Sequence, residues 1–328
     1  MTTETDDLAR RILAGNRRAL ARAITLVESG REDHRQQAGA LLGALRKSGR
    51  EALRIGLSGA PGVGKSSFIE AFGMMLVQAG LKVAVLAVDP SSARSGGSIL
   101  GDKTRMERLS RADNAFIRPS PSRTQLGGVA RRTREAVALC EAAGFDLVLV
   151  ETVGVGQSET LVAGMCDLFV LLLAPGGGDE LQGVKRGIME MADLILVNKA
   201  DGELKAAATR TCADHAGALR LMPGRAGDAP GFPKAMLVSA MTGAGLERAW
   251  AEMQALANWR KEHGFWAQNR RRQAQDWFEE EVRLGLLARL EAPETRARMA
   301  EGAQAVAEGR ASPVEAAGAL LAWLHKDE

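Results

Sequence analysis

The 328-residue chain lacks the features that mark secreted and membrane-spanning proteins. Its three cysteines lie far apart and include no Cys-x-x-Cys pair, which argues against a disulfide framework or a thiolate metal site. No apolar run approaches the roughly 18 residues of a membrane-spanning helix. The acidic start is not followed by the apolar core of a signal peptide. We therefore expect a cytoplasmic protein that does not cross a membrane.

An excess of charge of one sign is also absent. The 43 Lys and Arg residues nearly balance the 40 Asp and Glu residues, for a net charge of +3. This balance gives no reason to expect nucleic acid or an anionic membrane as a partner. The arginines at 131–134 and 270–272 fall short of the broad basic surface that RNA binding needs. We expect them to form salt bridges with another subunit or a partner, or one of them to stabilise transition-state charge near the γ phosphate.

Hydrophobic patterning divides the chain into three expected parts. Apolar residues at helical spacing predict two helices within residues 1–50, an N-terminal helical extension. In residues 51–246, short apolar segments alternate with helical ones, which indicates a mostly parallel, doubly wound α/β sheet of P-loop NTPase type. Residues 247–328 carry all five tryptophans and predict a helical C-terminal region. The expected strands are 53–57, 82–88, 147–150, 168–173, 194–197 and 236–238.

The C-terminal region is expected to contain one long helix. Apolar residues recur at every fourth position from Phe278 to Leu290, which predicts a stripe that faces its own domain or another subunit. Pro293 should end or interrupt this helix. Ser312 and Pro313 predict the N-cap and first position of a last helix.

Residues 59–66 read Gly-Ala-Pro-Gly-Val-Gly-Lys-Ser, a complete match to the P-loop pattern between an expected strand and an expected helix. Glycines let the backbone curl so that its N–H groups point at phosphate, and the helix N-terminus adds positive potential. Lys65 is expected to reach the β and γ phosphates, and the Ser66 hydroxyl to supply an oxygen to Mg²⁺. The expected nucleotide contacts are Gly59, Pro61, Gly62, Val63, Gly64, Lys65, Ser66 and Ser67.

A base-recognition sequence, Asn-Lys-Ala-Asp, occupies residues 198–201 at the carboxyl end of an expected strand. The Asp201 carboxylate can accept hydrogen bonds from guanine N1–H and the 2-amino group, a donor pair that adenine lacks. Lys199 is expected to lay its stem over the base, and Asn198 to tie this loop to the P-loop. The residues expected in a second base-contacting loop are Ser239, Ala240 and Met241.

Carboxylates follow two strands at the edge of the sheet that carries the P-loop. Asp89 and Glu151 each end an expected strand, and we expect them to hold Mg²⁺ or its waters. Asp102 is a further metal candidate. Glu151 and Gly154 have the form of a switch that senses the γ phosphate, and Gln157 is the candidate for orienting the attacking water. The expected catalytic residues are thus Lys65, Glu151 and Gln157.

Together these motifs closely resemble one family, the MeaB and methylmalonic aciduria type A proteins, which are ArgK-like P-loop GTPases. The resemblance covers nearly the whole chain. Its most specific parts are the Glu-led second switch and a Gly-rich segment, which generic small GTPases lack. The segments that carry it are Gly59–Ser67, Asp89–Ser92, Gly96–Asp102, Glu151–Ser158, Pro175–Gln182 and Asn198–Asp201.

The resemblance implies a slow GTPase that uses GTP/GDP and Mg²⁺ and binds methylmalonyl-CoA mutase. It implies that the protein gates the loading of adenosylcobalamin and protects or reactivates the mutase. It also implies a homodimer formed through the C-terminal region. A third switch would transmit the nucleotide state to the mutase, with Asp179, Gln182 and Lys185 as candidate residues.

Two other functions remain open. The nickel-inserting maturation GTPases share the P-loop, but they hold metal on His or Cys clusters, whereas the four histidines of this chain are scattered. A P-loop kinase or transport ATPase is the second alternative. Asp201 argues against it because this residue is expected to select guanine.

Overall fold

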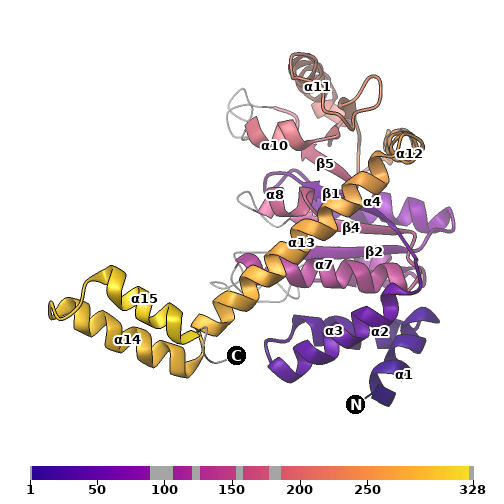
Figure 1. Cartoon of the computed structure of the whole chain (residues 1–328). Coiled ribbons are helices and arrows are strands. Elements are labelled where there is room, and N and C mark those ends of the chain that lie inside the picture. The colour runs from indigo at the N-terminus through magenta and orange to yellow at the C-terminus, as the bar shows by residue number, and fades with distance from the viewer. Residues whose placement is uncertain (1, 89–105, 120–125, 153–157, 177–185, 325–328) are drawn as a thin grey trace. The chain divides into compact units, whose positions relative to one another are not determined.

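The computed structural model describes residues 2–88, 106–119, 126–152, 158–176 and 186–324. These residues form one sheet of seven parallel strands. The strands are β1 Leu53–Ser58, β2 Val83–Val88, β3 Ala115–Arg118, β4 Leu147–Thr152, β5 Leu168–Leu173, β6 Leu194–Val197 and β7 Lys234–Leu237. Their order across the sheet is β3-β2-β4-β1-β5-β6-β7, with β1 at the centre (Figure 1). The predicted doubly wound α/β fold is confirmed.

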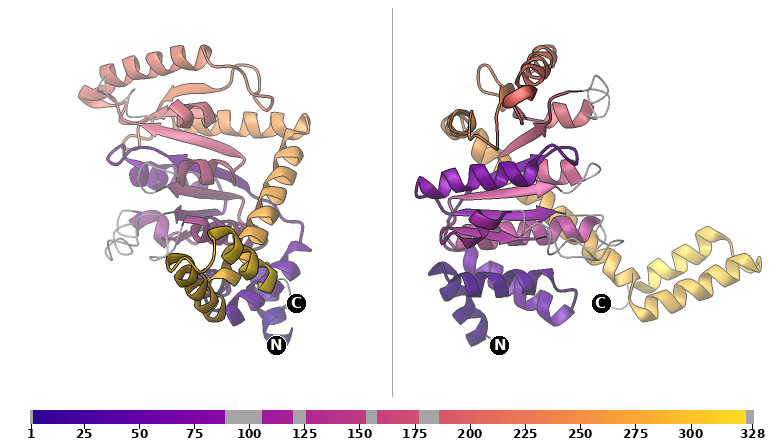
Figure 2. Two further views of the ribbon diagram at one scale, coloured as in Figure 1. Left: turned by 60° about the vertical axis from the view of Figure 1, so that its left-hand side comes forward. Right: turned by 180° about the vertical axis from the view of Figure 1, so that it is seen from behind.

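Helices cover both faces of the sheet (Figures 1 and 2). They are α4 Lys65–Gln78, α6 Glu107–Arg111, α7 Leu126–Ala142, α8 Ser158–Ala163, α10 Arg186–Met191, α11 Lys205–Arg220 and α12 Leu246–Glu262. The buried side chains form two clusters, one on each face. One cluster includes α7 and α8, and the other includes α4, α6 and α12. Because successive strand side chains point to opposite faces, the wholly apolar strands β2, β5 and β6 contribute side chains to both cores.

Gly56 shows how tightly one face is packed. A Cβ atom at this position in β1 would lie 2.8 Å from the Val162 Cγ1 atom of α8 and 2.9 Å from the Phe169 ring of β5. At this position β1 therefore has no room for a side chain on the face that α8 covers. This close contact holds α8 against the centre of the sheet, beside the carboxyl ends of β1 and β4.

The N-terminal extension differs from the prediction in its number of helices. The described part of residues 1–50 forms three helices, α1 Thr2–Leu13, α2 Arg17–Glu28 and α3 Glu32–Arg46, where two were expected. The first break falls at Gly15, which has φ of 76°, and at Asn16, whose side chain accepts a hydrogen bond from the Ala19 N–H and caps α2. The three helices pack on one another and on α7.

The strand β3 was not predicted. It pairs with β2 in the register Val83↔Ala115 and forms one edge of the sheet. Its sequence, Ala-Phe-Ile-Arg, has only three apolar residues in a row, too short a run to be recognised as a strand. The other six predicted strands are present, with ends that differ by up to two residues.

Contacts divide the chain into two compact units, residues 1–273 and 274–328. The first unit contains α12, which buries Leu246, Met253 and Leu256 against the sheet. The helix α13, Phe265–Leu290, begins in the first unit and continues into the second. No described helix has the length and apolar character needed to cross a lipid bilayer.

The second unit holds the end of α13 together with α14 Pro293–Ala307 and α15 Pro313–Leu324. The break after α13 lies where it was predicted, since Pro293 opens α14. Ser312 caps α15, because its hydroxyl accepts a hydrogen bond from the Glu315 N–H at 3.2 Å. The predicted apolar stripe on α13 is exposed in this chain, with Phe278 at 68% and Leu286 at 58%.

Candidate functional site

The P-loop connects the end of β1 at Ser58 to the start of α4 at Lys65, at the carboxyl edge of the central strand. Two of its glycines are required by close contacts. A Cβ atom at Gly59 would lie 2.3 Å from the Leu172 carbonyl oxygen, and one at Gly64 would lie 2.7 Å from Asn198 Nδ2. Gly64 also has φ of 91°, in the left-handed region that favours glycine. The loop is therefore curled and held against β5 and residue 198.

Lys65 lies at the start of α4 and bends back over the loop. Its Nζ atom donates hydrogen bonds to the carbonyl oxygens of Gly59 at 2.6 Å and Ala60 at 3.2 Å. Burial lowers the pKa of Lys65, and the negative charges of Glu151 and Glu159 oppose that shift. The P-loop lysine thus sits between backbone carbonyls and two carboxylates, where an anionic phosphate can replace the carbonyls as its partner.

Glu151 lies near the end of β4, the strand between β1 and β2. In the sheet register it is aligned with Leu57 of β1, and its residue is 4% exposed. The next residue, Thr152, donates a hydrogen bond from its hydroxyl to Ser58 Oγ at 3.0 Å, and both side chains are buried. This bond joins the end of β4 to the start of the P-loop, so Glu151 is placed beside the phosphate site.

Two of these residues were not predicted as part of the site. Thr152 joins β4 to the P-loop through its hydrogen bond to Ser58. Glu159, at the start of α8, is fully buried, and its negative charge raises the pKa of Lys65. Neither belongs to a spacing pattern. A buried carboxylate eight residues after Glu151 becomes recognisable only when α8 is packed against the sheet.

Asn198 joins three loops at the end of β6. Its Nδ2 atom donates a hydrogen bond to the Val63 carbonyl oxygen in the P-loop at 3.0 Å. Its Oδ1 atom accepts a hydrogen bond from the Ala240 N–H, also at 3.0 Å. The residue is 1% exposed, so both bonds are shielded from water. The phosphate loop and both predicted base loops are therefore connected through one buried amide.

Lys199 adds a second connection to the P-loop. Its Nζ atom donates a hydrogen bond to the Gly62 carbonyl oxygen at 2.8 Å. Its backbone has φ of 57°, and it is the one non-glycine residue with positive φ among those the structure describes. A long side chain rarely adopts this conformation, so the surrounding contacts must hold it there. Its stem consequently spans the space between the base loop and the P-loop.

Asp201 contacts the loop that follows β7. Ser239 donates a hydrogen bond from its hydroxyl to Asp201 Oδ2, and the Thr242 N–H donates to Ser239 Oγ at 3.1 Å. Ser239 is fully buried, whereas Met241 is 83% exposed. The structure thus places the predicted base-selecting carboxylate and the second loop together, next to the P-loop.

Seven of the predicted site residues lie outside the described part of the chain: Asp89, Asp102, Gly154, Gln157, Asp179, Gln182 and Lys185. Those that lie inside it gather at the carboxyl edge of β1, β4, β6 and β7. Ligands of open parallel sheets bind at this edge. Across the described residues, no group of three His, Cys, Asp or Glu side chains is placed to hold a metal ion.

The chain matches the family model described as methylmalonyl Co-A mutase-associated GTPase MeaB over residues 20–295. A putative GTPase of Caulobacter vibrioides is 52% identical over 97% of each chain. The mitochondrial methylmalonic aciduria type A homolog of Mus musculus is 46% identical over 96% of this chain and 78% of that protein. A crystal structure of a LAO/AO transport system kinase has a TM-score of 0.73 and 35% identity, covering 98% of this chain and 97% of that one.

These matches extend beyond the nucleotide site. The family model covers most of the helical extensions as well as the sheet, and the Caulobacter relative is similar over nearly its full length. The chain is a GTPase that belongs to the methylmalonyl Co-A mutase-associated GTPase MeaB family.

Proposed function

We propose that this GTPase is a chaperone of methylmalonyl-CoA mutase, which couples GTP hydrolysis to the loading of adenosylcobalamin and to the protection or reactivation of the mutase. The partner is supported by the family description and by the similarity to the methylmalonic aciduria type A homolog. Guanine nucleotide binding is supported most directly by the buried Asn198 amide. This amide joins the P-loop to the base loops and so links recognition of the base to binding of the phosphates.

Nucleotide binding follows from the contacts at the sheet edge. The β and γ phosphates take the place of the Gly59 and Ala60 carbonyl oxygens as partners of Lys65, while the P-loop N–H groups cradle them. Asp201 accepts the two donors of guanine, and Ser239 holds its second oxygen. The Lys199 stem, stretched toward Gly62, covers the base.

The residues fit Mg²⁺, which prefers hard oxygen ligands. Ser66 presents a hydroxyl in the first turn of α4, and Glu151 presents a buried carboxylate beside Lys65. With Asp89 and Asp102 they form the proposed ligand set for the ion or its waters. Bound there with the nucleotide, Mg²⁺ would neutralise negative charge on the phosphates.

Hydrolysis and signalling are assigned to the segments that precede α8 and α10. In the proposal, Gly154 contacts the γ phosphate and Gln157 orients the attacking water, so loss of the γ phosphate releases this segment. Asp179, Gln182 and Lys185 form the third switch, which reports the nucleotide state to the mutase. Both helices that follow, α8 and α10, pack on the sheet and on each other.

We also assign dimerisation to the C-terminal region, residues 247–328. The support is the exposed stripe on α13, where Phe278, Val282 and Leu286 are 47–68% exposed. Exposed apolar surface of this kind is typical of an interaction site. Residues 51–246 are then the nucleotide domain, and residues 1–50 its N-terminal extension.

The proposal is tested with purified methylmalonyl-CoA mutase. GTP turnover is measured with and without the mutase, and complex formation is followed by size-exclusion chromatography with GDP or a non-hydrolysable GTP analogue. The expected result is faster turnover and a complex whose stability depends on the nucleotide. A Lys65→Ala variant serves as the control for nucleotide dependence. If the mutase neither stimulates turnover nor forms a complex with either nucleotide present, the chaperone role is refuted. The GTPase assignment would remain intact.

A second candidate function rests on the name of the structural neighbour, a LAO/AO transport system kinase. That role requires phosphoryl transfer from ATP to another molecule. It is tested by incubating the protein with γ-labelled ATP or GTP and following the label. ATP turnover as fast as GTP turnover, with label in a product other than inorganic phosphate, would favour this candidate over the proposed one.

A further inference from the structure

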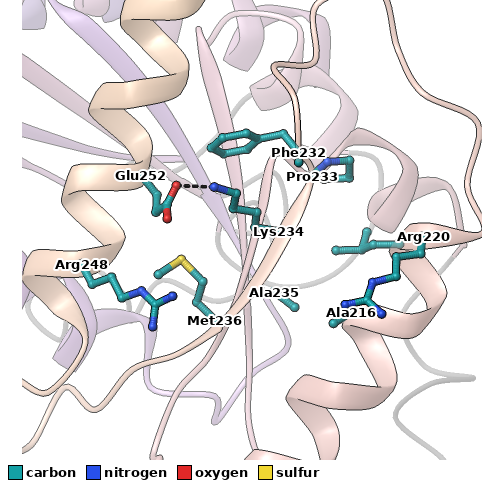
Figure 3. Close-up of a pocket in the computed structure, with 11 residues that line it drawn as sticks. Ala216, Arg220, Phe232, Pro233, Lys234, Ala235, Met236, Arg248 and Glu252 are labelled. Carbon is teal, nitrogen blue, oxygen red and sulfur yellow. Dashed lines mark hydrogen bonds and ion pairs between the residues drawn. The ribbon is translucent and has the colours of Figure 1, made fainter.

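A groove lies along the outer edge of the sheet, at β7. Its floor is formed by β7 and by the Phe232–Pro233 segment before it, and its walls by α11 and α12 (Figure 3). The groove has a volume of about 470 Å³ and lies apart from the predicted phosphate and base contacts. Ala216 and Leu219 of α11 and Met236 of β7 give it an apolar lining.

The backbone of β7 can accept a further strand. In the described part of the sheet β7 has one neighbour, β6, and is therefore an edge strand. The Lys234 N–H donates to the Asp193 carbonyl oxygen at 3.2 Å, and the Val238 N–H donates to the Val197 carbonyl oxygen at 2.9 Å. Because backbone bonding alternates along a parallel strand, the N–H and C=O groups of Ala235 face away from β6. Ala235 lines the groove and is partly exposed.

The groove also carries uncompensated positive charge. Its one acidic side chain, Glu252, is paired with Lys234 Nζ at 2.5 Å. Arg220 at the end of α11 and Arg248 in the first turns of α12 are both exposed, and neither has an acidic partner among the described residues. Figure 3 shows them on opposite sides of β7. Any strand added at this edge would therefore run between two arginines.

Lys234 does not prevent such an addition. A lysine on an edge strand normally discourages pairing with another chain. Here the Lys234 ammonium group is neutralised by Glu252 and lies over the Phe232 ring at 4.3 Å from its centre. The side chain is thus held within the groove wall, and its charge is compensated.

We propose that this groove is a docking site for an extended acidic segment of a partner protein, which adds to the sheet beside β7. The backbone groups of Ala235 supply the main-chain hydrogen bonds of strand addition. Arg220 and Arg248 select carboxylates on the added segment, since an acidic side chain there gains a partner that the chain itself does not provide. The apolar lining receives the alternate side chains.

The test uses the full-length protein and a fluorescein-labelled octapeptide in which pairs of glutamates alternate with pairs of valines, so that both faces of the extended strand carry carboxylates. An octapeptide with lysine in place of glutamate is the control probe. Binding is measured by fluorescence anisotropy at low salt. The acidic peptide is expected to bind and the basic peptide not to bind. The double variant Arg220→Ala/Arg248→Ala is expected to weaken binding of the acidic peptide about tenfold, as expected for the loss of two exposed charge pairs.

A charge-matched control distinguishes binding in the groove from general attraction of an acidic peptide to the positive charge of the protein. Arg18 and Arg46 are exposed on α2 and α3, so the double variant Arg18→Ala/Arg46→Ala removes the same charge outside the groove. It should bind the acidic peptide like the wild type. Equal weakening in both double variants would overturn the proposal, as would absence of binding at about 1 mM peptide, the weak end of specific affinities.

A backbone variant tests strand addition itself. Ala235→Pro removes the N–H that faces the groove and leaves the hydrogen bonds of Lys234 and Val238 to β6 in place. It should weaken peptide binding, whereas Ala235→Ser, which keeps the N–H, should not. If Ala235→Pro does not fold, hydrogen–deuterium exchange of the wild type decides instead. The acidic peptide must slow exchange of the Ala235 amide, and unchanged exchange there would refute strand addition.

Discussion

Replacing Asn198 by alanine is expected to cost about 2–4 kcal/mol, shared between the stability of the fold and the affinity for nucleotide. The substitution removes the bonds to the Val63 carbonyl oxygen and the Ala240 N–H, each 3.0 Å long. Both partners lie around a residue that is 1% exposed, and a buried group that loses its partner costs about 1–3 kcal/mol. If the loops that contain Val63 and Ala240 move so that these two groups reach water, part of that cost is recovered.

The loops separate most easily when no nucleotide holds them together, so part of the loss should appear in nucleotide affinity. Each 1.4 kcal/mol, roughly, raises the dissociation constant tenfold. Urea unfolding with and without GDP and titration with a fluorescent GDP analogue measure the two parts. Asn16→Ala is the matched control, because it removes one side-chain bond, from the cap of α2, and should lower stability without changing GDP affinity. An Asn198→Ala variant with wild-type stability and GDP affinity would refute the reasoning.

Three other substitutions test separate contacts. Lys65→Ala removes the cation expected at the β and γ phosphates and should abolish or strongly reduce GTP turnover; an unchanged rate would reject its role. Asp201→Asn exchanges an acceptor for a donor and should move preference from guanine toward xanthine nucleotides in competition binding, and retained guanine preference would reject the base assignment. Arg270→Ala breaks ion pairs of 2.6 and 2.9 Å and should destabilise the fold by about 3 kcal/mol in urea unfolding, while the exposed Arg272→Ala should have little effect. Burial raises the pKa of Asp167, and Arg270 opposes that shift. The stability lost in Arg270→Ala should therefore become smaller as the pH falls and Asp167 becomes protonated. A stability loss that is independent of pH would contradict this.

The sheet was predictable where its strands are wholly buried. The strands at 147–152 and 168–173 are covered on both faces, and their apolar runs, 147–150 and 168–173, are continuous and easily recognised. At the edge of the sheet this signal fails, and Ala115–Arg118 was missed. The extra break among the N-terminal helices depends on Gly15 and Asn16, two residues that also occur within helices. Local turn chemistry outweighed helical periodicity there.

The nucleotide site was predictable to the extent that its chemistry is local. The P-loop and the residues at 198–201 follow spacing patterns because one loop binds one part of the ligand. Contacts between loops follow no such pattern. The bond between Thr152 and Ser58 spans 94 positions, and the burial of Glu159 results from the packing of α8. The left-handed backbone of Lys199 could not be predicted either, since lysine does not favour it.

We expect the P-loop and the loops joined by Asn198 to form one site for a guanine nucleotide. Displacement of a bound fluorescent GDP analogue from the wild-type protein by GTP or ATP, in the presence of Mg²⁺, tests it most directly. The structure predicts that GTP displaces the analogue and that ATP does not, because adenine lacks the donor pair that Asp201 accepts. Displacement by ATP at the same concentrations as GTP would contradict the claim.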